Sequence, residues 1–314
     1  MPSNSYNAVA AISRDTLIED AYREIGVLGD GKVLTGNQIE RATRKLNMLM
    51  ATLARSDMRG EFTTIRKRVT LFLQKGQAHY QIGGSDHCTQ TYYETTAGAT
   101  IAAAATSIQV VSSASMTIGD YVGVLLTSGS WEWHTILTIP DSTHYTIASP
   151  GMVGTAASGA TVVNYTTALT APLEILTAVL RDTDDNDTPI SLDMTLADYE
   201  LIGDKAALGD PFEAYVEYAR TTTDLWSDRA ANDASRVVRL TVRMPFSDMD
   251  ASTDTFDCSQ AGLRALLYAL AVDLAPSNSK PITPALAQNY ATAMAPFLDE
   301  NSRTTDVYFQ PGAE

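Results

Sequence analysis

The feature that most constrains the fold is a long interval without basic residues. No lysine or arginine occurs between Lys75 and Arg181, although the 314-residue chain has 22 of them. Within this interval, from about Cys88 to Thr166, Thr, Ser, Ala and Gly dominate, and short β-type runs such as "DYVGVLL" and "TVVNYT" alternate with turn sequences. Short strands at such spacing are typical of a small sandwich or barrel. The sequence therefore predicts an all-β domain at 88–166, inserted into a different structure.

Helical periodicity precedes this interval. Apolar residues at 17–28 and at 39–53 recur every three or four positions, which predicts an α-helical hairpin with one apolar seam. The pairs Thr16–Glu19 and Thr35–Gln38 have the spacing of capping boxes at the two helix starts. After Gly60 the apolar period becomes two, and two strands joined by a turn at Gly76 are expected.

The C-terminal flank mixes both periods. Strands are expected in "LEILTAVLR", "TPISLDM", "FEAYVEY", "TDLW" and "RVVRLTVRM". Three helices are expected: a short one after Thr195, one at 257–275, and a last one after Thr283. Pro296 should kink or shorten the last helix. The expected fold class is α+β, with the helical hairpin and C-terminal helices around a small β-sheet, and the inserted β-domain besides. Residues 1–87 and 167–301 then form one core, 88–166 the insert, and 302–314 an extended tail.

Charge is divided unevenly along the chain. The net charge is −15, yet residues 1–75 hold 12 of the 22 basic and 8 of the 37 acidic residues, which makes them positive by 4. The acidic remainder disfavours tight DNA binding, because that affinity comes from Lys and Arg displacing counterions from phosphates. Cys88 and Cys258 lie far apart, and no run approaches the roughly 20 apolar residues of a membrane span. We expect a soluble protein made in a reducing cytosol, without a membrane partner.

The stretch "RDTDDNDTPISLD" at 181–193 concentrates five aspartates. Four of its residues fall at positions 1, 3, 5 and 12 of an EF-hand count, the spacing of a calcium loop: Asp182, Asp184, Asn186 and Asp193. Position 6 is Asp187 where that loop needs Gly, and strand-like runs flank the stretch instead of helices. An acidic turn at the tip of a β-hairpin is therefore the favoured interpretation.

Other candidate chemistries are weaker than their structural alternatives. "GVLGDGKV" at 26–33 resembles a phosphate-binding loop but lacks its final Ser or Thr and follows a helix, so a helix end and turn is expected. The four histidines lack metal-ligand spacing, and "SNSK" at 277–280 is expected to be a helix connection. Acidic pairs are common on solvated faces, as here Glu19 with Glu24 and Glu213 with Glu217. We expect no catalytic residue, no metal site and no cofactor.

The order of these parts resembles the head-to-tail adaptors of tailed bacteriophages, also called tail accessory factors or head completion proteins, especially those of short-tailed phages. Four segments, spread between residues 17 and 211, carry the resemblance: "LIEDAYREIGVLGDGKVLTGNQIERATRKLNMLMATLARSDM", "LFLQKGQAHYQIG", "PISLDMTLADYELIGDKAALGDP" and, in the insert, "IQVVSSASMTIGDYVGVLLTSGSWEWHTILTI".

This resemblance implies a structural virion protein and not an enzyme. Members form a ring, usually a dodecamer, assembled in the host cytoplasm between the portal protein and the tail nozzle or hub, with tail fibres or tailspikes as further neighbours. Genomic DNA passes through the ring without specific binding. Members also place a C-terminal segment against the portal, which implies a portal interface at Val307, Tyr308 and Phe309.

The acidic stretch fits a DNA channel if it faces the lumen. Carboxylates repel phosphates within the range that salt leaves unscreened, so they would keep DNA sliding. The candidate channel-lining residues are Asp182, Asp184, Asp185 and Asp187. A solvated outer face is the alternative for this loop.

Two other functions remain open on the sequence alone. A peptidoglycan-degrading virion enzyme would use one of the acidic pairs named above. A glycan- or receptor-binding module would use the insert, where Trp131 and Trp133 share a strand face and Tyr121 and Tyr145 lie nearby in the sequence. Because Trp131 and Trp133 share a strand face, packing of at least one face into a core is the favoured interpretation of these two residues.

Overall fold

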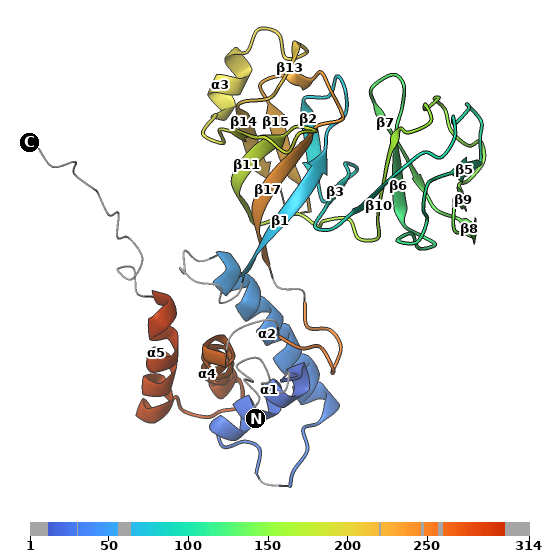
Figure 1. Cartoon of the computed structure of the whole chain (residues 1–314). Coiled ribbons are helices and arrows are strands. Elements are labelled where there is room, and N and C mark those ends of the chain that lie inside the picture. Colours follow the sequence, from blue (N-terminus) through green and yellow to red (C-terminus); the bar gives the residue numbers. More distant parts are fainter. Residues whose placement is uncertain are drawn as a thin grey trace, which may run out of the picture. The chain divides into compact units, whose positions relative to one another are not determined.

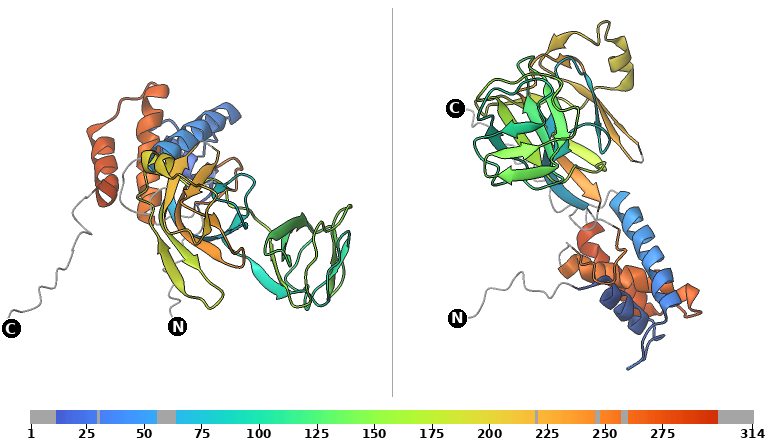
Figure 2. Two further views of the ribbon diagram at one scale, coloured as in Figure 1. Left: turned by 90° about the horizontal axis from the view of Figure 1, so that it is seen from above. Right: turned by 90° about the vertical axis from the view of Figure 1, so that its right-hand side faces the viewer.

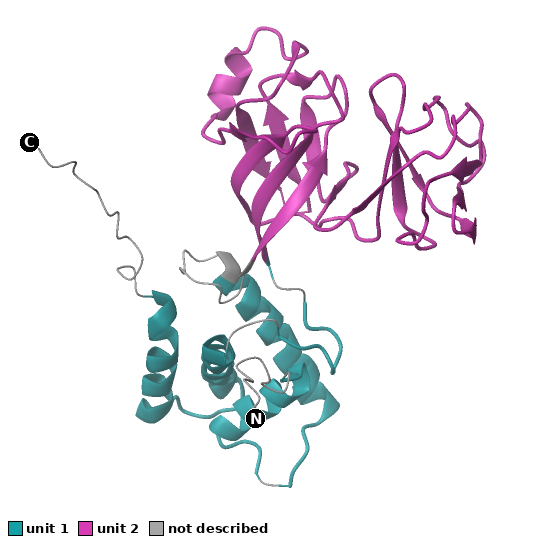
Figure 3. Ribbon diagram, in the orientation of Figure 1, with its two compact units in different colours: residues 1–65, 245–314 teal, residues 66–244 magenta. Residues whose placement is uncertain are grey.

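The computed structural model describes residues 12–29, 31–55, 64–219, 221–245, 248–256 and 260–298. It contains 25% helix and 32% strand in several small sheets, so the chain is a mixed α and β protein as predicted. The chain divides into two compact units (Figure 3), unit 1 with residues 1–65 and 245–314, and unit 2 with residues 66–244.

Unit 1 is built from helices. α1 (Arg14–Glu24), α2 (Gly36–Arg55), α4 (Gln260–Ser277) and α5 (Pro284–Leu298) lie together in every view (Figure 1, Figure 2) and share one apolar core. This core takes no described side chain from a strand, so the four helices pack on one another. The reason is that each helix carries an apolar stripe that another helix can cover. The expected arrangement of helices around a small sheet stays a prediction. No helix in the described ranges is long and apolar enough to cross a membrane.

Local capping fixes the helix starts. Ser13 is the N-cap of α1, and its hydroxyl accepts the Thr16 backbone N–H at 3.3 Å, so the predicted Thr16–Glu19 cap is wrong by one turn. Before α2 the Gln38 side chain accepts the Thr35 backbone N–H at 2.9 Å, which is one half of the predicted box.

The last helix passes through its proline. Thr283 caps α5 as predicted, because its hydroxyl accepts the Leu286 backbone N–H at 3.2 Å. α5 continues beyond Pro296 to Leu298, so Pro296 does not end the helix, and a kink there stays a prediction. Phe297 is buried in the helical core, and its burial offsets the missing backbone hydrogen bond.

Unit 2 contains a two-layer sandwich. A five-stranded sheet has the order β12-β11-β17-β1-β3, and a three-stranded sheet has the order β14-β15-β2. The strands are β1 (Thr64–Phe72), β2 (His79–Ile82), β3 (Cys88–Thr89), β11 (Glu174–Arg181), β12 (Asp187–Ile190), β14 (Ala214–Tyr218), β15 (Thr223–Ser227) and β17 (Val237–Pro245). One apolar core takes side chains from both sheets, so their inner faces pack together.

The strands on either side of Gly76 do not pair as a hairpin. β1 belongs to the five-stranded sheet and β2 to the three-stranded sheet, so the turn carries the chain from one layer to the other. Gly76 has φ of 83°, and its N–H donates to the Ala231 carbonyl at 2.7 Å. The remaining elements are α3 (Leu196–Leu201), which Thr195 caps as predicted, and the parallel pair β13 (Leu208–Gly209) with β16 (Ala230–Ala231).

Besides β3, which belongs to the five-stranded sheet, seven strands lie inside the interval predicted as an insert. They form the sheets β4-β10-β6-β7 and β5-β9-β8, which share one apolar core. The strands are β4 (Tyr93–Thr96), β5 (Ser107–Gln109), β6 (Tyr121–Leu125), β7 (Trp131–Thr135), β8 (Thr138–Asp141), β9 (His144–Thr146) and β10 (Thr161–Tyr165). The run "WEWHTILTI" gives one strand to each sheet, because the chain changes sheet at the buried Ile136. The boundaries at 88 and 166 stay a prediction, since 66–244 forms one unit.

Candidate functional site

The acidic stretch forms the tip of the β11–β12 hairpin. The two strands pair antiparallel, with Arg181 opposite Asp187 at the last position before the loop. β11 is also paired along its length with β17, and its alternate side chains at Ile175, Ala178 and Leu180 are buried. The sheet therefore fixes the register of the hairpin and holds the base of the loop.

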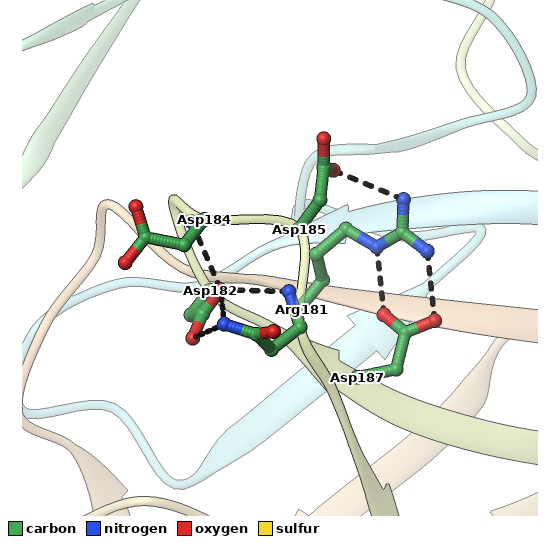
Figure 4. Close-up of polar contacts among 6 residues, drawn as sticks. Arg181, Asp182, Asp184, Asp185 and Asp187 are labelled. Atoms are coloured by element: carbon green, nitrogen blue, oxygen red, sulfur yellow. Dashed lines mark hydrogen bonds and ion pairs between the residues drawn. The ribbon is translucent and has the colours of Figure 1, made fainter.

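Arg181 closes the loop as a fork (Figure 4). Its Nε and Nη2 atoms donate to the two carboxylate oxygens of Asp187, at 2.7 Å each, and Nη1 donates to Asp185 at 3.1 Å. These hydrogen bonds lower the pKa of Asp187 and raise the pKa of Arg181. One arginine thus orients two of the four aspartates at this exposed tip.

Asp182 holds the backbone of the turn. Its Oδ1 accepts the backbone N–H groups of Asp184 and Asn186 at 2.9 Å each, and its Oδ2 accepts from the Asn186 side chain at 3.1 Å. The Asn186 side chain is the largest cause that lowers the pKa of Asp182. Asp185 has φ of 63°, a left-handed conformation that Asp tolerates in turns. The predicted polar hairpin turn is therefore confirmed.

The same geometry shows what the loop can do. Its carboxylates point in different directions, and those of Asp182, Asp185 and Asp187 bind the loop's own groups, so they do not converge on a common centre (Figure 4). Within the described residues, no three His, Cys, Asp or Glu side chains are placed to hold a metal ion. Four aspartates and one arginine give residues 181–187 a net charge of −3. The loop is thus a fixed acidic projection, which repels polyanions over about one Debye length, ~8 Å in physiological salt.

The insert's tryptophans lie in an aromatic cluster that we call the junction cluster, formed by Phe72, His87, Tyr92, Tyr121, Trp131, Trp133 and Tyr165. The Trp131 side chain is 7% exposed, and its Nε1 donates to the Ala234 carbonyl at 2.6 Å. Both indoles meet the Phe72 ring edge-on, at centroid distances of 5.8 and 5.2 Å. Core packing is therefore confirmed for Trp131, and the half-buried Trp133 packs against the same cluster with His87 stacked on its ring.

His87 lies on one side of the junction cluster. Its ring stacks on Trp133 at 3.8 Å, and its Nδ1 forms a hydrogen bond with the Tyr165 hydroxyl at 2.5 Å. Burial lowers the pKa of His87 to about 4. Gly123 faces Trp133 on the neighbouring strand, and a Cβ atom there would lie 2.7 Å from the indole. Glycine is thus required for this close approach.

The outer face of the five-stranded sheet carries arginines that the sequence analysis did not assign to a site. Val238, Leu240 and Val242 of β17 point into the core, so Arg239 and Arg243 point outward. The same alternation, with Val69 and Leu71 inward, places Arg66 and Arg68 on the outer side of the adjacent β1. The sequence contains a signal for this face, since Arg66 and Arg68 are two positions apart in a strand-like run and must therefore lie on the same side of the strand. The sequence analysis took this spacing only as evidence for a strand.

The remaining candidate residues lie partly outside and partly inside the described ranges. The portal-interface residues Val307, Tyr308 and Phe309 lie outside the described residues, as does Cys258. Glu19 is paired with Arg23 at 3.3 Å on α1. The glycine-rich segment follows the end of α1, and Gly26 has φ of 66°, which confirms the helix end and turn expected there.

Comparisons with known proteins name no family. No family model matches the chain, and no curated protein matches it. Among solved structures, VP17, a capsid protein of bacteriophage P23-77, aligns with 9% identity over 58% of this chain and 80% of that chain, with a TM-score of 0.11. A TM-score of this size carries no argument about fold or function.

Proposed function

We propose that this chain is a structural virion protein, a ring-forming adaptor that joins the portal vertex to the tail nozzle and forms part of the DNA channel. The observation that carries the proposal is the β11–β12 tip, where Arg181 holds the carboxylates of Asp185 and Asp187 and the loop's own backbone holds that of Asp182. A wall that lets DNA slide needs fixed negative charge without basic groups that bind phosphate.

The electrostatics of the tip suit this role. The pKa values of Asp182 and Asp187 are lowered, so both carboxylates stay ionised at pH values where an ordinary aspartate begins to bind a proton. Because Asp182 accepts two backbone N–H groups, the loop cannot turn its charge away without breaking those bonds. Repeated around a ring, such tips would form a collar of negative charge around the DNA.

The finer organisation belongs to the same proposal. The helices of unit 1 and the sandwich strands of unit 2 would form the adaptor core, with 88–166 as a β-domain inserted into it. The segment containing Val307, Tyr308 and Phe309 would dock on the portal, and the neighbours below would be the tail nozzle or hub and the tail fibres or tailspikes. The genome passes through, and the chain acts without a cofactor or catalytic step.

Assembly on the portal tests this proposal. The purified chain is mixed with purified portal rings, and the mass of the complex is measured by native mass spectrometry. We expect many copies per portal ring, most simply twelve, and a loss of binding in the double variant Tyr308→Ala with Phe309→Ala. Tyr93→Ala, an exposed tyrosine in the insert, is the matched control and should bind normally. A chain that never joins the portal would overturn the proposal.

A further inference from the structure

Two unlike surfaces lie on opposite outer faces of the unit 2 sandwich. The first, the arginine face, is the outer side of the five-stranded sheet with Arg66, Arg68, Arg181, Arg239 and Arg243. Arg181 is paired with Asp187, and Arg243 with Glu174 at 3.1 Å. Arg66, Arg68 and Arg239 take part in none of the ion pairs found among the described residues, and the buried Nε of Arg239 has no hydrogen-bond partner there. This face therefore carries positive charges, those of Arg66, Arg68 and Arg239, that no ion pair among the described residues neutralises.

The second surface, the acidic leucine patch, is the segment 193–213 with α3 and β13. It lies on the outer side of the three-stranded sheet, because Leu225 points into the core while its neighbour Trp226 points out and meets Tyr199 of α3 at a centroid distance of 5.6 Å. α3 buries none of its side chains. Leu201 is 83% exposed and Leu208 60% exposed, with Leu196 and Phe212 also exposed.

The patch combines this apolar surface with strong negative charge. Its 21 positions hold six acidic residues and one lysine, a net charge of −5, although Asp210 is paired with Arg236 and the Arg229 guanidinium lies over the Phe212 ring. Exposed leucines gathered on a short helix that contributes nothing to the core are typical of an interaction surface. An apolar centre with a charged rim is the usual composition of a protein interface, and the rim here requires a basic partner.

We propose that the arginine face of one copy receives the acidic leucine patch of the next copy. The inference rests on the proposed ring and adds the contact that would build it. Since the two surfaces differ and lie on opposite faces of one sandwich, the contact is head-to-tail, and such a contact closes into a ring when the rotation between copies allows it. Nucleic acid fits less well, because phosphates would pair with the arginines but would leave the leucines exposed.

Two variants, each breaking one surface, test the contact. Arg66→Glu with Arg68→Glu reverses two exposed charges of the arginine face, and Leu201→Arg with Leu208→Arg disrupts the patch. Sedimentation velocity over a range of concentrations should show large wild-type assemblies, fewer at high salt, and monomers for either variant. Mixing the two variants should give a discrete 1:1 dimer, because one intact face of each kind remains. Val153→Arg, 81% exposed in the insert, and Arg44→Glu on α2 should assemble like the wild type.

The outcomes separate this contact from the ring itself. Wild-type assemblies that persist in both variants would overturn the contact and leave the proposed ring standing. A wild-type chain that is monomeric alone and adds only single copies to the portal would overturn the ring and the contact together. A short DNA duplex that binds the wild type but not the arginine variant, with self-association unchanged in that variant, would assign the arginine face to nucleic acid and contradict the proposal.

Discussion

The acidic tip and the junction cluster differ in how far apart in the sequence their contacting residues lie. In the tip, Arg181 and Asp182 bind groups no more than six residues away, and Asp184, Asp185 and Asp187 stay exposed. In the junction cluster, the Trp131 indole bonds a carbonyl 103 residues away, and His87 bonds a hydroxyl 78 residues away. The tip presents chemistry to the outside, whereas the junction cluster uses its aromatic groups to hold unit 2 together.

The largest expected effect is a core substitution in the junction cluster. Trp131→Ala removes a buried indole and leaves the Ala234 carbonyl without its donor, so we expect a loss of about 3–5 kcal/mol in the free energy of unfolding. Urea denaturation followed by circular dichroism measures it. Trp131→Phe keeps a ring in place and should lose less. A loss below about 1 kcal/mol for Trp131→Ala would mean that the indole is not part of the core.

The next effect is a pH dependence at His87. Because the pKa is lowered to about 4 in the folded protein, from about 6.5 in the unfolded chain, the unfolded chain binds the proton more readily between these values. The free energy of unfolding is therefore highest above pH 6.5 and falls as the pH drops towards 4. We expect a decrease of about 1–2 kcal/mol after allowing for partial exposure.

Urea denaturation at several pH values measures this slope. His87→Gln keeps a polar partner for Tyr165 but cannot titrate, so its stability should change less over the same window. A variant slope equal to the wild-type slope would show that other groups cause the pH dependence.

A third experiment addresses the charge of the tip. Asp184→Lys with Asp185→Lys should raise non-specific affinity for duplex DNA by roughly tenfold at low salt, with a steeper salt dependence, because phosphates now meet cations. Fluorescence anisotropy with labelled DNA measures it. Asp204→Lys with Asp210→Lys makes the same change in charge in the segments that follow α3 and β13, and serves as the control, since Asp210 pairs with Arg236 as Asp185 pairs with Arg181. Equal gains in both variants would show that total charge matters and the tip does not.

The smallest effect is local. Asp182→Ala removes the acceptor of two backbone N–H groups, so we expect faster hydrogen exchange at the amides of Asp184 and Asn186. Exchange in the β11–β17 pairing should be unchanged, because those bonds are independent of the tip. Unchanged exchange at Asp184 and Asn186 would show that the turn does not depend on the Asp182 carboxylate.

Much of the fold could be predicted from local patterns. The acidic turn, the Thr195 and Thr283 caps and most strand and helix positions depend on residues close in sequence. The pairing of strands could not be predicted, since the turn at Gly76 joins different layers and the chain changes sheet at Ile136. The N-cap of α1 was predicted at the wrong residue because Ser13 and Thr16 are both suitable N-cap residues, and the sequence does not show at which of them the helix begins.

Only part of the candidate site could be predicted from the sequence. The sequence predicted the acidic tip, because every contact that holds its aspartates joins residues close to one another in the sequence. The arginine face was missed because Arg66 and Arg239 become neighbours only when β1 and β17 lie side by side. The partners of Trp131 and His87, the Ala234 carbonyl and the Tyr165 hydroxyl, come from segments distant in the sequence. The spacing of apolar residues along the chain does not show which distant segments pack together.

A cryo-EM map of the intact virion tests the central claim most directly. The account predicts a ring of this chain between the portal and the tail nozzle, with the β11–β12 tips carrying Asp184 and Asp185 directed into the DNA channel. A map with no density for this chain at that junction would contradict the account, and so would a ring whose tips face outward while another surface lines the channel.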